Sequence, residues 1–61
     1  MNKTTQDILQ TIAYTGQAVI PDHKARELHA ALDLIEAGIC YRSSTHLGYI
    51  IIKFGRPPVS I

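Results

Sequence analysis

The stretch Leu28–Phe54, LHAALDLIEAGICYRSSTHLGYIIIKF, decides the fold of this chain. Its first part carries apolar residues at helical spacing, which predicts an amphipathic helix. The predicted apolar stripe consists of Ala25, Leu28, Leu32 and Ile35. Gly38 ends this helix, because a glycine adopts the left-handed conformation of a helix C-terminus without steric cost.

After Gly38 the apolar period falls to about two, which predicts a β-hairpin. Ile39–Arg42 forms its first strand, and Tyr49–Phe54, rich in β-branched and aromatic residues, forms the second. The polar segment Ser43–Gly48 is expected to be the loop between them. Pro57 and Pro58 lack the amide hydrogen that a ladder needs, so the second strand ends near Phe54.

Two further elements are expected before Leu28. The first is a helix capped by Thr4 or Thr5 and ended by Gly16. Its apolar face consists of Ile8, Leu9, Ile12 and Ala13. The second is a short edge strand at Ala18–Ile20. Pro21 then suits the first turn of the second helix, which is expected to run to about Ala37.

These elements predict an α+β fold with two helices packed on a C-terminal β-hairpin and a short third strand. We expect a single domain over residues 1–61, with flexible ends at residues 1–3 and 57–61. A chain of 61 residues buries only about 60% of its unfolded surface, so its core is marginal. A homodimer is therefore expected.

Composition limits the function classes. The hydrophobic fraction is 46%, the charged fraction 18% and the net charge +1, so no global basic field drives nucleic-acid binding. The single cysteine, Cys40, cannot form an internal disulfide, which favours a reducing cytoplasm. His23 and His29 lack the spacing of metal ligands on one helix, and we expect no metal, no cofactor, no membrane span and no enzymatic activity.

The element order and the junction Leu34-Ile35-Glu36-Ala37-Gly38-Ile39 resemble winged-helix domains, in which a similar step joins the recognition helix to the wing. The resemblance covers about Ala25 to Phe54 and extends to small phage-encoded regulators that bind host transcription machinery. The chain departs from that pattern because only 17 residues separate Ile20 from Gly38. The helix-turn-helix is therefore curtailed. The small size also suits a phage or mobile-element gene product.

Charge on the second helix favours a protein partner over DNA. The face opposite the apolar stripe is net negative, whereas phosphate contacts come chiefly from Arg and Lys. The predicted protein-binding residues are Asp22, Arg26, His29, Asp33 and Glu36. The candidate DNA-binding residues, at the helix start and around the hairpin, are Lys24, Arg42, His46, Lys53 and Arg56.

The second hairpin strand is apolar on both faces. Tyr49 and Ile51 lie opposite Ile50 and Ile52, so either the C-terminal tail or a second molecule covers them. We predict that Tyr49 and Ile51 form a dimer interface. Two functions stay open: an interaction module that regulates a macromolecular machine by binding a protein surface, and a small dimeric DNA-binding regulator. The first is favoured.

Overall fold

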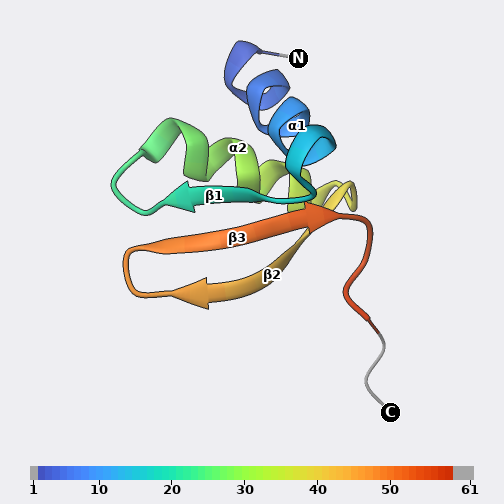
Figure 1. The fold of residues 1–61 in the computed structure, drawn as a ribbon. Coiled ribbons are helices and arrows are strands. Elements are labelled where there is room, and N and C mark those ends of the chain that lie inside the picture. Colours follow the sequence, from blue (N-terminus) through green and yellow to red (C-terminus); the bar gives the residue numbers. More distant parts are fainter. Residues whose placement is uncertain (1, 59–61) are drawn as a thin grey trace.

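The computed structural model describes residues 2–58. These residues form helix α1 (Lys3–Thr15), strand β1 (Ala18–Pro21), helix α2 (Ala25–Glu36) and a hairpin of β2 (Cys40–His46) and β3 (Tyr49–Phe54). The strands make one antiparallel sheet in the order β1-β3-β2, with β3 in the centre (Figure 1). The predicted α+β fold is confirmed, including the third strand.

The core lies between the two helices and one face of the sheet. Cross-strand partners project from the same face, and the alternation along β3 turns Ile50 and Ile52 toward the helices. The buried cluster consists of Ile8, Ile12, Ala18, Ile20, Ala30, Ala31, Leu34, Cys40, Ile50 and Ile52. Every element contributes to it, so the fold has a single core.

Helix α1 starts two to three residues earlier than expected, with Asn2 in place of Thr4 or Thr5 as its N-cap. The side chain of Asn2 caps it, with its Oδ1 accepting a hydrogen bond of 2.9 Å from the Thr5 backbone N–H. The prediction of a threonine cap is therefore wrong, because asparagine is an equally strong N-cap and stands before both threonines. Lys3 belongs to the helix rather than to a flexible end, whereas Met1 lies outside the described residues. Gly16 ends the helix, as predicted.

Pro21 was expected in the first turn of α2. It is instead the last residue of β1. The Asp22 N–H donates to the Gly48 carbonyl oxygen at 2.9 Å, so residue 22 occupies a hydrogen-bonded position opposite β3. Hydrogen-bonded positions alternate in an antiparallel pair, so the missing N–H of Pro21 leaves no gap in the ladder. The Pro21 carbonyl accepts from the Lys24 N–H at 3.2 Å, and the helix begins at Ala25.

The predicted apolar stripe of α2 is rotated relative to the real core-facing side. Ala30, Ala31 and Leu34 are buried, whereas Leu32 is 46% exposed and Ala25 is exposed. The other two stripe members, Leu28 and Ile35, pack against the core from its margin. The stripe followed the largest apolar side chains, whereas two small alanines, Ala30 and Ala31, are part of the packed core.

The end of α2 agrees with the prediction. Gly38 has a φ of +79°, a conformation that residues with a Cβ adopt only at a cost. Its N–H donates to the Ile35 carbonyl at 3.0 Å, and the Ile39 N–H donates to the Leu34 carbonyl at 3.0 Å. These bonds satisfy carbonyls at the end of the helix and turn the chain directly into β2.

The hairpin has a tighter turn than expected. The polar residues after Arg42 continue β2 up to His46, and only Leu47 and Gly48 form the turn. The predicted loop Ser43–Gly48 is therefore wrong. Polar side chains are tolerated because β2 is an edge strand, exposed to solvent over most of its length. Gly48, with a φ of +90°, supplies the conformation the turn requires.

Candidate interaction surfaces

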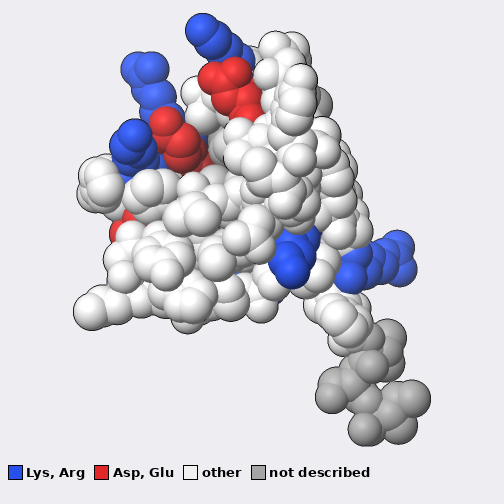
Figure 2. Space-filling model, viewed as in Figure 1, with Lys and Arg blue, Asp and Glu red and all other residues white. Residues whose placement is uncertain are grey.

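Among residues 2–58, both helices pack on one face of the sheet and leave the outer face open (Figure 1). The register aligns Val19, Ile51 and Ser44 across its middle, and Pro21, Tyr49 and His46 beside the hairpin turn. Val19 is 53% exposed, and Tyr49 and Ile51 are half-buried. Figure 2 shows that the surface over β1 and the hairpin is largely free of charged side chains. We call Val19, Tyr41, Tyr49 and Ile51 the open sheet face.

The described part of the C-terminal tail does not cover the open sheet face. Arg56, Pro57 and Pro58 are all exposed. After β3 the chain leaves the end of the sheet and runs away from it (Figure 1). Residues 59–61, which also belong to the predicted flexible end, lie outside the described range.

The hairpin end of the open sheet face is ordered by side-chain contacts. The rings of His46 and Tyr49 stack, with centroids 4.7 Å apart and planes inclined by 16°. The Ser44 hydroxyl and Nε2 of His46 are hydrogen-bonded at 2.9 Å. Leu47, at the turn, is fully exposed. His46 is thus held against the sheet by its neighbours.

Four of the predicted protein-binding residues lie together on the outward side of α2. Arg26, His29, Asp33 and Glu36 are exposed on the helix, whereas Asp22 lies in the turn after β1. A hollow between α1 and α2 is lined by Asn2, Lys3, Thr4, Arg26, His29, Ala30 and Asp33. Sequence reasoning missed Lys3 because it placed Lys3 in a flexible end. Asn2, a favourable N-cap residue, could have indicated that the helix begins at Lys3. The face therefore carries mixed charge.

The candidate DNA-binding residues do not converge. Arg42 pairs with Ile52 and so projects from the side of the sheet that faces the helices. Lys53 pairs with Tyr41 and projects from the open sheet face. Lys24 stands before α2 and Arg56 follows β3. DNA binding stays a prediction, but these side chains do not form one phosphate-contacting surface.

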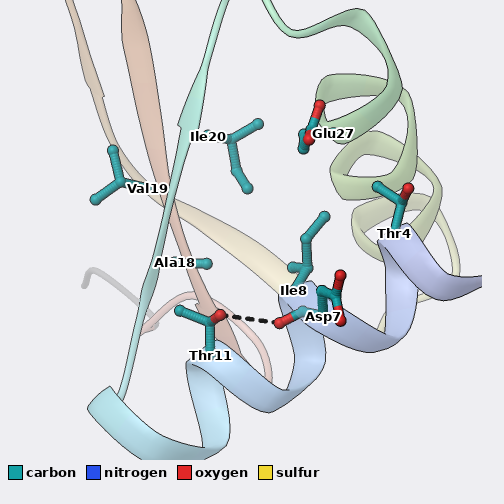
Figure 3. A pocket seen from close by; sticks show the side chains of 8 residues that line it. All are labelled: Thr4, Asp7, Ile8, Thr11, Ala18, Val19, Ile20 and Glu27. Carbon is teal, nitrogen blue, oxygen red and sulfur yellow. Dashed lines mark hydrogen bonds between the residues drawn. The ribbon is translucent and has the colours of Figure 1, made fainter.

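A small groove lies between α1, β1 and the start of α2. Its volume is about 200 Å³, and it is lined by Thr4, Asp7, Ile8, Thr11, Ala18, Val19, Ile20 and Glu27 (Figure 3). Ile8 and Ile20 point into the space between the elements, while the Val19 side chain points away, to the other side of β1. Val19 therefore lines the groove with its backbone. We call this the β1 groove.

The remaining features to consider are the thiol of Cys40, possible metal ligands and possible membrane spans. Cys40 is buried in the core, and burial raises the pKa of its thiol, which disfavours the reactive thiolate. Within residues 2–58, no three His, Cys, Asp or Glu side chains are grouped to hold a metal ion. Neither helix of this described range is long and apolar enough to cross a membrane.

The chain matches no protein-family model, no curated protein and no solved structure. Functional inference therefore rests on the surfaces described above.

Proposed function

We propose that this protein is a small non-enzymatic interaction module that works as a homodimer and binds a protein partner. The observation that carries the proposal is the open sheet face, which presents Val19, Tyr49 and Ile51 while both helices pack on the opposite side. Contiguous exposed apolar surface commonly marks an interaction site. A chain of 61 residues also has little core of its own to stabilise a monomer.

A second copy of the chain is the occupant that fits the open sheet face best. A two-fold axis that lies between the two sheets, perpendicular to β3 and level with Ile51, places the Lys53 of each copy over the Tyr49 of the other. These two residues flank Ile51 at equal distances along the strand. A cation above a tyrosine ring is a favourable contact. Like charges are thereby kept apart, and the two apolar centres meet.

The size of the face predicts a weak dimer. Three strands spaced about 4.8 Å apart and about 20 Å long cover roughly 300 Å² of sheet. Side-chain relief increases the accessible area, yet a stable interface needs about 500 Å² or more from each partner. Leu47, at the hairpin turn, extends the patch. We therefore expect dissociation constants in the micromolar range.

Such a dimer leaves the outward side of α2 available for a protein partner. α2 packs on the inner face of the sheet, so face-to-face association places the two copies of this helix on the outside of a four-layer particle. Arg26, His29, Asp33 and Glu36 then remain exposed twice, on opposite sides. Two equal sites on one particle raise the apparent affinity for a multivalent target.

Sedimentation velocity at protein concentrations from about 1 to about 200 μM tests the proposal, because a weak dimer dissociates within roughly this range. The wild type should shift from monomer to dimer, and Ile51→Glu should remain monomeric because two buried carboxylates would face each other. Leu32→Glu is the matched control, since it changes an equally apolar but exposed residue on α2. A wild type that stays monomeric, or a control that dissociates as Ile51→Glu does, overturns the proposed dimer.

The partner contact has its own test. Replacing Asp33 and Glu36 with lysine should remove proteins that the wild type captures, because like charges then meet where opposite ones did. The dimer should persist in this variant. Unchanged capture by a well-folded variant would show that the partner does not bind the outward side of α2.

A further inference from the structure

The β1 groove has a combination of features that the dimer and the helix face do not use. It adjoins the free edge of an edge strand, its floor is apolar, and its rim carries carboxylates. Ile8, Ala18 and Ile20 form the buried floor. Asp7 and Glu27 come from α1 and α2, and no Lys, Arg or His lines the groove.

The backbone of β1 directs one residue's hydrogen-bonding groups into this groove. The Asp22 N–H bonds to Gly48, so Ile20 and Ala18, two and four residues earlier, also direct their groups to β3. Val19 lies between them and directs its N–H and carbonyl to the free edge. The next outward position, Pro21, has no N–H and its carbonyl already accepts from Lys24. The edge can therefore anchor one residue of an added chain.

We propose that the β1 groove binds an extended segment of a partner protein that carries a lysine or arginine next to its anchoring residue. This inference rests on the proposed function as a protein-interaction module. The anchoring residue exchanges hydrogen bonds with Val19, as in other cases of strand addition. Because successive side chains of an extended chain alternate, the neighbouring side chain enters the groove.

The size and charge of the groove select this side chain. At about 200 Å³, the groove is smaller than the roughly 300 to 1,000 Å³ of typical small-molecule pockets. A single long side chain fits better: its methylene stem lies on Ile8, Ala18 and Ile20, and its charged end reaches the carboxylates. The nearby cations Lys3 and Arg26 line the hollow between α1 and α2 and are not among the residues that line the groove.

Titration of the ¹⁵N-labelled protein with a defined peptide tests the inference. The probe is an acetylated and amidated heptapeptide of alternating threonine and valine with one central lysine. We expect the largest amide chemical-shift changes at Ile8, Ala18 and Val19. The peptide with a central lysine should bind most tightly, the one with norleucine more weakly and the one with glutamate most weakly. Neutralising both carboxylates, in Asp7→Asn with Glu27→Gln, should weaken lysine-peptide binding about fivefold.

Val19→Pro isolates the backbone contact. It removes an N–H that faces the free edge, so the β1–β3 ladder remains intact and peptide binding is lost. Val19→Thr keeps the N–H and should bind as the wild type does. Unchanged amide shifts in α2 verify that both variants fold.

Three results would overturn the inference. The first is the absence of amide shifts at millimolar peptide concentration, and the second is equal binding of the lysine and glutamate peptides. The third is that n-butylamine alone produces the same amide shifts, which would identify a site for small amines. The open sheet face uses the side chain of Val19 and the β1 groove uses its backbone, so sedimentation and peptide binding distinguish the two proposals. Loss of the dimer with retained peptide binding overturns only the dimer. A stable dimer without peptide binding overturns only the groove.

Discussion

The core-facing side of α2 is the part of the structure most directly testable by mutation. Leu34 is 3% exposed and Leu32 is 46% exposed, although both are leucines in the middle of one helix. Leu34→Ala should cost about 2 to 5 kcal/mol of the free energy of unfolding, because it removes buried methyl groups and leaves a cavity. Leu32→Ala should cost less than about 1 kcal/mol. Helix propensity contributes equally to the two changes and cancels in the comparison.

The loss at Leu34 is large relative to the whole fold. At roughly 0.05 to 0.15 kcal/mol per residue, a chain of this length has about 3 to 9 kcal/mol of stability in total. With a urea m-value near 1 kcal/mol per molar, the unfolding midpoint should fall by about 2 to 5 M. Circular dichroism of urea-induced unfolding measures this shift. Leu34→Met, which conserves volume, should cost less than about 1.5 kcal/mol and stays measurable if the alanine variant does not fold.

Equal midpoints for the two alanine variants, or a larger loss at Leu32, would refute this assignment of the core. The periodicity of the large apolar residues would then describe the helix better than the packing does.

Three further predictions concern the α1 cap, the buried thiol and two basic side chains of the hairpin. Asn2→Ala should lower stability by about 0.5 to 2 kcal/mol in thermal melts through loss of the α1 cap, whereas an unchanged melting temperature would show that the cap is dispensable. Because burial raises the folded-state pKa of Cys40, the folded protein retains this proton longer than the unfolded chain as pH rises. The free energy of unfolding should therefore be constant below the ordinary thiol pKa of about 8.5 and should fall above it, with Cys40→Ala abolishing that fall. Replacing Arg42 and Lys53 with alanine should leave the salt dependence of any duplex DNA binding nearly unchanged, because the two side chains project from opposite faces of the sheet. Fluorescence anisotropy at several salt concentrations measures this dependence. A decrease of about 0.9 in the log–log slope for each replaced residue would contradict the prediction.

The sequence was sufficient to predict the types of the helices and strands and their order, because the local signals that define these elements agree with the tertiary structure. Gly16 and Gly38 end helices in the conformation that glycine favours, and the β-branched run Tyr49–Phe54 forms a strand. The alternation in this strand also located the open sheet face correctly, since Ile50 and Ile52 are buried while Ile51 is only half-buried.

Sequence reasoning failed where tertiary context decided between two locally acceptable states. Pro21 is acceptable in the first turn of a helix and at an edge strand, and only the pairing with β3 selects the strand. Ala30 and Ala31 give a weak hydrophobic signal, yet both are buried in the core. The β1 groove could not be predicted, because its carboxylates come from two helices and its hydrogen-bonding groups belong to the backbone.

The central position of β3 has a consequence for folding. β1 and β2 each pair with β3 and not with one another, and Val19 and its partner Ile51 are separated by the whole of α2 and β2. The loop entropy of that long closure must be overcome before the β1 ladder contributes any stability. The β2–β3 hairpin is local and can close first, offering β3 as a template on which β1 docks together with both helices. The folding rate should therefore be set by the docking of the N-terminal half onto the hairpin.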